Sequence, residues 1–461
     1  SYTLYVDNYA RSDDGRLPLD LLVSIADGDT LIYYQNGVRW DIPIVGGALE
    51  DVHFGQVFFV TSSQWTNNYT ATLKYIGIAD LDDTSELRYV DNLRVSSTPY
   101  GCDMTLAFDI HADYSRYEMV DVMKRLADEY GIMGTLHTFV HGDPSYGEGF
   151  AENASLLASL KDARASGWEL GTHALSSSTS IDRATAIAYL EKHKELLGEY
   201  PRIWTDHGYM SHNLWKDGGN QASDYYIADV LAKHLICAWL NIAATYHRSG
   251  MDVNIDGMHV GEIGGIDTYA ASRGRYLSYL PSSEQVSYMG YMSSRATIVL
   301  HDYLTSLCVV RDGDTLIGTS PGTGVTVTPG WYMSPQTNYQ DNEWFLHPKF
   351  KASIEAMTSG GTVWSSGVSE IYQYTEAVRD LIIDEGATYI RIANPSAMDL
   401  RGLTLYTLDS DRPEYVLYHN GKYYAPQPAA HGWNFVIDNV PRGGVITFEK
   451  VERPSFMPEI M

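Results

Sequence analysis

The segment Thr105-Leu-Ala-Phe-Asp-Ile-His-Ala-Asp113 decides the fold that we expect for this chain. It begins inside an apolar run, residues 104–108, which is typical of a buried strand. It ends with three side chains that can bind a metal or move a proton: Asp109, His111 and Asp113. Because α/β folds place their active sites at the C-terminal ends of strands, the segment predicts a functional strand end. The alternative is a strand that leaves the core through a polar turn.

The residues that follow have a helical pattern. Apolar side chains recur every three or four residues over 116–130, and Gly131 predicts the end of that helix. Strand-like and helix-like runs then alternate to about residue 385. Such alternation implies parallel strands joined by crossover helices, so we expect residues 101–385 to form an α/β sheet or barrel.

The two flanks have a different pattern. Residues 1–100 and 386–461 contain short β-rich runs separated by turn signals such as Asn420-Gly421. They predict a β-rich N-terminal domain over 1–100 and a C-terminal β-sandwich over 386–461. A chain of 461 residues is also longer than one core usually serves, in agreement with two or three domains.

Composition limits the partners of the chain. The net charge of −26 disfavours nucleic acid and anionic membranes, and no run of 18 apolar residues could span a bilayer. Tyrosine and tryptophan number 35 and 10, a load that favours a carbohydrate ligand, with β-sandwich packing as the alternative. The three cysteines show neither metal-ligand spacing nor a disulfide framework. The N-terminus lacks a signal-peptide pattern, and a chain numbered from Ser1 fits a mature form, so we expect a secreted or cell-surface protein.

Reactive residues follow three further predicted strands. These are Gly167-Trp-Glu-Leu-Gly-Thr-His173, Asp206-His207-Gly208 and Thr297-Ile-Val-Leu-His301-Asp302. A single histidine after a strand is usually structural, but four reactive strand ends in one α/β domain would meet at one rim. Imidazole and carboxylate together suit a divalent ion, and we expect Zn²⁺.

These motifs carry a resemblance to the polysaccharide deacetylase family, carbohydrate esterases with a distorted (β/α) barrel. The segment 167–173 resembles the family's Gly-His-Glu-Ile-Gly-Asn-His, and Ala107-Phe-Asp109 resembles its Thr-Phe-Asp-Asp. Residues 298–302 resemble its late Leu-His strand, which carries the catalytic histidine, and Trp239 stands where the family keeps a pocket tryptophan. The similarity covers about residues 101–375 in the family's order. It implies a (β/α)7-type barrel and metal-dependent removal of acyl groups from a polysaccharide or oligosaccharide.

The sequence departs from the family's metal motif. Ile110 replaces the metal-binding aspartate, Ser177 stands where a second histidine is expected, and residues 206–208 differ from the family's Arg-Pro-Gly region. We therefore expect a rewired site whose four metal ligands come from three strand ends: Asp109 and His111 from the first, His173 from the next and His207 from the one after. A lost site is the competing interpretation.

The remaining roles follow as hypotheses. Asp109 or Asp113 would take a proton from water, and His301, held by Asp302, would protonate the leaving group. A polar-aromatic loop, together with the pocket tryptophan, would bind the sugar through Tyr209, His212, Asn213 and Trp239, although the loop could also only cap the barrel.

Two other functions remain open from sequence. A glycoside hydrolase or lyase could use Asp109 and Asp206 as an acid/base pair in the same cleft. A non-catalytic glycan-binding protein could keep the barrel and lack a working site. Release of acetate would indicate the esterase. New reducing ends or unsaturated sugars would indicate the glycoside hydrolase or lyase, and sugar binding without turnover would indicate the binding protein.

Overall fold

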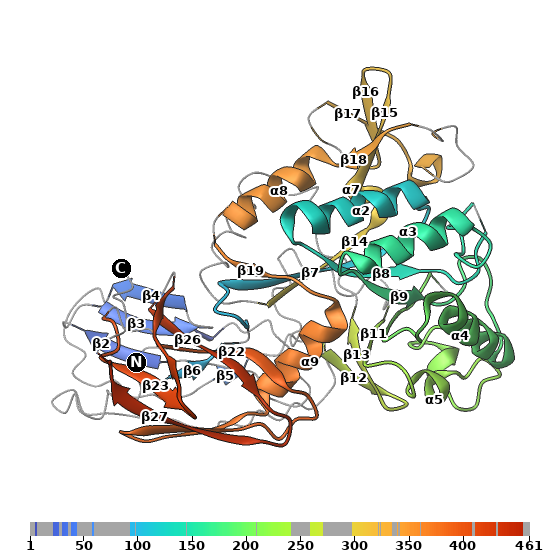
Figure 1. Ribbon diagram of the computed structural model, residues 1–461. Helices are drawn as coiled ribbons and strands as arrows, with labels where there is room; N and C mark the ends of the chain where they lie inside the picture. The colour runs from blue at the N-terminus through green and yellow to red at the C-terminus, as the bar shows by residue number, and fades with distance from the viewer. Residues whose placement is uncertain are drawn as a thin grey trace. The chain divides into compact units, whose positions relative to one another are not determined.

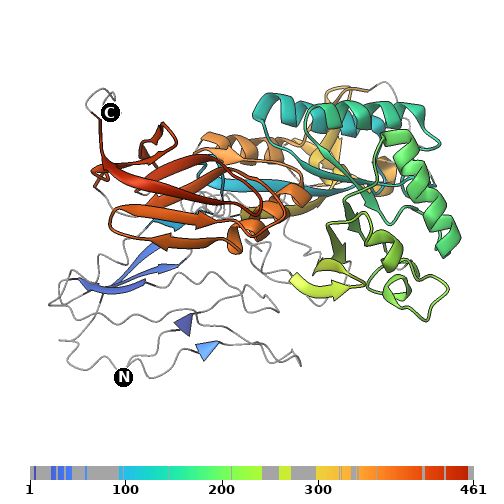
Figure 2. The same ribbon diagram turned by 60° about the horizontal axis from the view of Figure 1, so that its bottom comes forward.

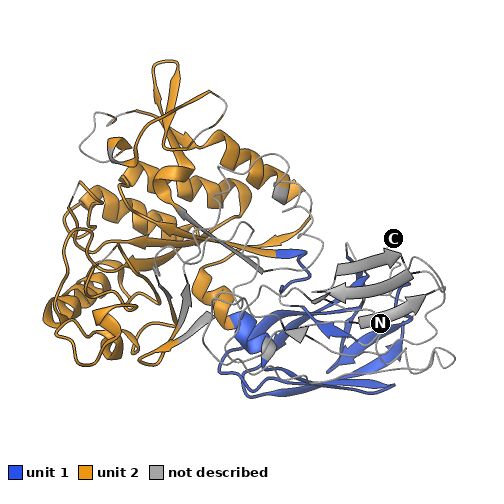
Figure 3. Cartoon of the chain, turned by 180° about the vertical axis from the view of Figure 1, so that it is seen from behind, with its two compact units in different colours: residues 1–104, 291–296, 374–461 blue, residues 105–290, 297–373 orange. Residues whose placement is uncertain are grey.

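Figure 1 shows the computed structural model of the chain. It describes residues 93–454 except 97, 144, 209, 241–258, 271–296, 321, 323, 334–338, 340, 341, 360, 408–410, 430 and 431. Of residues 1–92 it describes only five strands: β1 (Tyr5–Val6), β2 (Leu22–Ala26), β3 (Thr30–Gln35), β4 (Val38–Pro43) and β5 (Phe58–Phe59). The chain divides into two compact units, residues 105–290 with 297–373, and residues 1–104 with 291–296 and 374–461 (Figure 3).

A mostly parallel sheet forms the centre of the first unit. Its parallel strands lie in the order β13 (Ile266–Ala270), β11 (Cys237–Leu240), β10 (Ile203–Thr205), β9 (Glu169–His173), β8 (Gly134–Thr138), β7 (Met104–His111) and β14 (Thr297–Tyr303). Strand β12 (His259–Ile263) is antiparallel to β13, and β19 (Val363–Trp364) also pairs with β7. Every residue of β7 is buried, as expected for a strand covered on both faces.

Helices connect these strands as the sequence predicts. They are α2 (Tyr117–Tyr130), α3 (Ala154–Ala165), α4 (Arg183–Leu197) and the short α5 (Ala228–Leu231). Gly131 ends α2 in the left-handed conformation at φ 64°, and the side chains of Asn153 and Asp182 cap α3 and α4 by accepting backbone N–H groups. Before α5 comes the 3₁₀ turn η1 (Asp217–Gly219).

The α/β class is confirmed, but the barrel is not. The strands from β7 to β11 follow one another in sequence order, as they would in a barrel. Among the described strands, however, none joins the β12 edge of the sheet to the β14 edge. The distorted (β/α)7-type barrel therefore stays a prediction.

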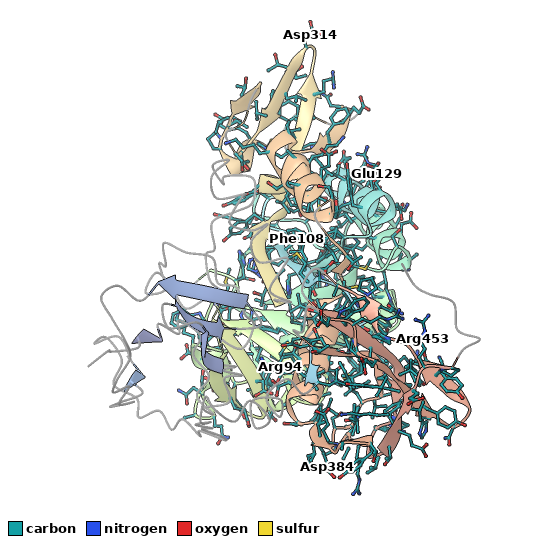
Figure 4. The ribbon with its side chains drawn as sticks, turned by 90° about the vertical axis from the view of Figure 1, so that its left-hand side faces the viewer. Arg94, Phe108, Glu129, Asp314, Asp384 and Arg453 are labelled. Carbon is teal, nitrogen blue, oxygen red and sulfur yellow. The ribbon has the colours of Figure 1, made fainter. Side chains whose placement is uncertain are left out.

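The later part of this unit packs against the same sheet. Phe108, labelled in Figure 4, meets Phe350 of α8 (Pro348–Ser359) edge to face, with ring centroids 5.3 Å apart. Before α8 come α7 (Leu304–Leu307) and a small sheet that the sequence did not predict, with Asp314 at the turn of its β15–β16 hairpin (Figure 4). Its strands are β15 (Cys308–Asp312), β16 (Thr315–Gly318), β17 (Val325–Val327) and β18 (Trp344–Leu346), and the 3₁₀ helix η4 (Gly330–Met333) lies between β17 and β18 in the chain. After β19 comes α9 (Val368–Arg379).

The other unit is β-rich, and Figure 2 shows its C-terminal strands in orange to red. One sheet holds β20 (Ile382–Glu385), β21 (Tyr389–Ala393), β27 (Val445–Glu452), β23 (Tyr415–His419) and β24 (Lys422–Tyr424). A second holds β25 (Gln427–Pro428), β26 (Trp433–Val440), β22 (Leu400–Thr407) and β6 (Arg94–Val95). Strand β6 comes from the N-terminal segment, so this unit contains residues from both predicted β-domains. The division at 100 and 385 stays a prediction.

None of the helices in the described part of the chain is long and apolar enough to cross a lipid bilayer.

Candidate metal centre

Four neighbouring parallel strands bring their C-terminal ends to one edge of the central sheet. His111 and His173 are the last residues of β7 and β9, Thr205 is the last of β10, and His137 lies one residue before the end of β8. The register pairs His111 with His137 and His173 with Thr205. The meeting of distant strand ends that the sequence predicts is therefore present in the structure.

Asp113 lies at the centre of this group. Its Oδ2 is 2.9 Å from His173 Nε2, and its Oδ1 is 2.9 Å from His207 Nε2. The ring of His111 lies 4.3 Å from that of His173, measured between centroids. One potential ligand atom each from His111, Asp113 and His173 lies within 4.8 Å of the other two. One carboxylate and two imidazoles thus surround a single point, with His207 on the second oxygen of Asp113.

The protonation states of Asp113 and His173 suit a cation. Burial raises the pKa of Asp113, but the charges and hydrogen bonds of His173 and His207 outweigh burial and hold that pKa well below its usual range. Burial lowers the pKa of His173 to about 4, against the opposing attraction of Asp113. An ionised carboxylate and neutral imidazoles are the forms that bind divalent metal ions. His173 Nδ1 also lies 3.5 Å from the backbone oxygen of Thr205, the outer contact that metal-bound histidines commonly make. The donor set fits a divalent ion.

Asp109 has a different place from the one expected. It is fully buried, its Oδ1 contacts His137 Nε2, and its Oδ2 is 3.8 Å from His111 Nε2. Thr205 Oγ1 lies 3.0 Å from the same His111 nitrogen. Asp109, expected as a metal ligand, thus contacts the histidines His111 and His137, and Asp113 is the carboxylate grouped with His111 and His173; which of the two binds an ion stays a prediction.

The expected proton acceptor is not a free carboxylate. Asp109 is sealed from solvent, and both oxygens of Asp113 face imidazole nitrogens.

Sequence reasoning also gave His137 no role. The signal was available in the sequence, since His137 stands in a mostly apolar run typical of a buried strand, where a histidine needs a polar partner.

The chain turns sharply just after His173. Ala174 and Leu175, both buried, have φ values of 49° and 64°, a left-handed conformation that is uncommon for residues with a side chain. Several hydrogen bonds hold this turn. Ala174 N donates to Thr205 O at 2.9 Å, and Leu175 O accepts from the backbone N–H groups of Val140 and His141 at 3.0 and 3.1 Å. Strain of this kind persists where the surroundings fix the backbone, and here it fixes the direction of His173.

Two expected sugar-binding residues are structural instead. His212 is fully buried, accepts from Ile181 N–H at Nδ1 over 3.1 Å and donates from Nε2 to Ala174 O over 2.7 Å. Asn213 is also fully buried; it accepts from His207 N–H at 3.1 Å and donates to the His207 and Gly208 carbonyls at 3.0 and 3.1 Å. His212 therefore supports the turn after His173, and Asn213 supports the loop that carries His207.

Asp206 also belongs to the framework. It is fully buried; its Oδ1 accepts from the indole of Trp204 and from Leu214 N–H, each at 2.8 Å, and its Oδ2 accepts from Trp215 N–H at 3.3 Å. Asp109 and Asp206, the acid/base pair that a glycoside hydrolase could use, are thus both fully buried and held by other groups, and their catalytic role stays a prediction.

Four expected site residues are not fully described. Tyr209 lies outside the described residues, as do the side chains of Trp239, His301 and Asp302. The backbone of β14 is described, and its register pairs His301 with Asp109 and Asp302 with Ile110. The strand that carries His301 thus lies directly beside the strand that carries His111.

No protein-family model matches the chain, and no curated protein matches it. Solved structures with weak similarity include a GH30 endoxylanase from Clostridium papyrosolvens C71, which is 10% identical with a TM-score of 0.26 over 78% of this chain and 98% of that one. An α-fucosidase from Thermotoga maritima is 10% identical with a TM-score of 0.24, covering 81% of this chain and 99% of that one. An α-L-fucosynthase from the same organism is 10% identical with a TM-score of 0.20, covering 80% and 99%. Likeness at these scores carries no argument about the fold or activity of this chain.

Proposed function

We propose that this chain is a metal-dependent hydrolase that removes acyl groups, such as acetyl, from a carbohydrate. The observation that carries the proposal is the convergence of His111, Asp113 and His173 at the C-terminal edge of a parallel sheet. A metal ion bound by two imidazoles and one carboxylate keeps coordination positions free for water or substrate, which is typical of catalytic metal sites. The resemblance of residues 101–375 to polysaccharide deacetylases supports an acyl group on a sugar as the substrate.

The roles of the residues follow from their places. His111, Asp113 and His173 would hold the ion, for which we propose Zn²⁺, with His207 as a further ligand on the more open side, where its side chain is 13% exposed. A divalent ion at such a site lowers the pKa of a bound water and polarises a carbonyl oxygen. Asp109 and His137, both fully buried, would hold the His111 ring in place. We keep His301 as the proposed donor of a proton to the leaving group, since β14 sets its backbone beside Asp109.

Product analysis with and without a chelator tests the proposal. Purified protein is incubated with acetylated xylan and with partly acetylated chitin, and free acetate and new reducing ends are measured separately. We expect acetate without reducing ends, loss of that activity with a chelator, and its return with added zinc. Acetate release that a chelator leaves unchanged would count against the metal, and no acetate from any acylated glycan would count against the hydrolase.

A glycoside hydrolase is the second candidate. The observation in its favour is that two carboxylates, Asp109 within β7 and Asp113 just after its end, contact the same group of histidines. New reducing ends from a glycan without acyl groups would favour this candidate. Sugar binding with no turnover and no metal would favour the non-catalytic alternative.

A further inference from the structure

Two tyrosines stand beside the candidate metal centre without a part in it. Tyr114 directly follows Asp113, and its ring lies 6.3 Å from the ring of Tyr146, measured between centroids at an interplanar angle of 40°. The Tyr146 side chain is 50% exposed. An exposed tyrosine alone is ordinary. A pair of rings next to a candidate ligand is a different case, because tyrosine rings pack on the C–H faces of sugars while their hydroxyls bond polar groups.

The backbone at Tyr114 is in an unfavourable conformation. Its φ is 55°, a left-handed value that is costly for a bulky side chain. The Tyr114 N–H donates to the Tyr146 carbonyl oxygen at 2.6 Å, so the same loop that presents Tyr146 stabilises this conformation. Strained residues cluster at functional sites, where the surrounding structure fixes them.

The loop that presents Tyr146 is fixed to the site. Asp143 accepts from the backbone N–H groups of Tyr146 and Gly147, each at 2.9 Å, and its own N–H donates to Ser177 Oγ at 2.8 Å, in the segment after β9. A Cβ added at Gly147 would lie 2.6 Å from the ring of Phe139. That ring in turn lies 4.8 Å from the His173 ring and 4.9 Å from the His207 ring, between centroids. The exposed ring is thus positioned relative to the histidines by packing and hydrogen bonds.

A third segment borders the pair. Gly330, at the start of η4, lies so close to Tyr114 that a Cβ added there would be 3.6 Å from Tyr114 Cδ2. Tyr332 in the same turn is 52% exposed.

We propose that Tyr114 and Tyr146 form a sugar-binding platform that holds a pyranose ring of the substrate next to the acylated residue. The proposal rests on the proposed function, since it places the acylated sugar at the metal centre. It goes further by naming the two side chains that would bind a neighbouring sugar ring of the substrate.

Binding measurements test the platform independently of turnover. The full chain and the variants Tyr146→Ala, Tyr146→Phe and Tyr200→Ala are titrated calorimetrically with N-acetylchitohexaose and with an acetylated xylohexaose. Tyr200 serves as the control, because its ring stacks on His234 at a centroid distance of 3.7 Å. It precedes the N-terminal end of β10, whereas the candidate metal centre lies at the C-terminal ends of the strands. Thermal unfolding of each variant checks that it folds.

We expect the wild type to bind at least one of the two oligosaccharides. Tyr146→Ala should weaken that binding about tenfold, whereas Tyr146→Phe and Tyr200→Ala should bind as the wild type does. Equal affinity of Tyr146→Ala and wild type, or no binding of either oligosaccharide by the wild type, would overturn the platform. If the wild type binds and Tyr146→Ala does not, while no acetate is ever released, the platform stands and the proposed function fails.

Discussion

Replacing His212 with glutamine tests whether this histidine is part of the framework. Both of its ring nitrogens bond backbone groups, an N–H of Ile181 and the carbonyl of Ala174, which requires the neutral form. Burial is the main cause that lowers the pKa of His212 to about 4, from an ordinary value of 6.5. Below about pH 6.5, His212 becomes protonated in the unfolded chain, whereas in the folded chain it stays neutral until about pH 4. The stability contributed by neutral His212 is therefore present near pH 7 and decreases as the pH falls through this window.

The size of the effect follows from the two pKa values. A pH of 5 lies about 1.5 units below the pKa of His212 in the unfolded chain, and still above its pKa in the folded chain. The free energy of unfolding is therefore about 2 kcal/mol lower at pH 5 than at pH 7. Urea unfolding at pH 7 and pH 5 measures it. The pH-dependent loss should be about 2 kcal/mol smaller in His212→Gln than in the wild type, even if the variant is less stable at pH 7.

His193 provides a matched second variant. It too is fully buried, and burial is the main cause that lowers its pKa to about 4, while its Nδ1 lies 2.8 Å from the Glu199 carbonyl oxygen. His193→Gln should reduce the loss between pH 7 and pH 5 by a similar amount. If wild type and both variants lose equal stability between the two pH values, the reasoning from burial is refuted.

Three further substitutions test the site and its support. Asp206→Ala should destabilise the fold by about 3 kcal/mol in urea unfolding, because three N–H donors, two of them in buried hydrogen bonds, lose their acceptor; a change below about 0.5 kcal/mol would contradict this role. His137→Ala should cost about 3–5 kcal/mol by leaving the Asp109 charge buried, and adding Asp109→Asn should recover part of it; additive losses would argue against the pair. His301→Ala should abolish acetate release while metal content stays, and full activity would show that its assignment is wrong.

The features predicted from sequence are those that local pattern determines. The spacing of apolar residues predicted α2, and Gly131 predicted its end. The α/β alternation predicted that the ends of β7, β9 and β10 would meet, because parallel strands place their C-terminal ends at one edge.

The choice between Asp109 and Asp113 depended on geometry that no pattern shows. In an ideally extended strand both side chains would point to the same face, because the alternation of side chains repeats every two residues. In the structure β7 ends at His111 and the chain reverses through Tyr114 at φ 55°, so Asp113 is placed against His173 while Asp109 stays inside the sheet.

The loop after β10 misled the sequence interpretation for a related reason. A polar-aromatic segment with His212 and Asn213 looks like a sugar subsite, but the same side chains can satisfy buried backbone groups. Which of the two occurs depends on tertiary burial. Here the N–H and C=O groups of Ile181, Ala174 and His207 occupy both side chains.

Metal content per chain, measured by mass spectrometry on wild type and on Asp113→Asn, tests most directly whether one carboxylate and its histidines bind a cation. The account predicts about one divalent ion per wild-type chain, removable by a chelator, and almost none in Asp113→Asn of unchanged fold. A folded wild type that binds no divalent ion when zinc is supplied, or an Asp113→Asn variant that retains it fully, would contradict the account.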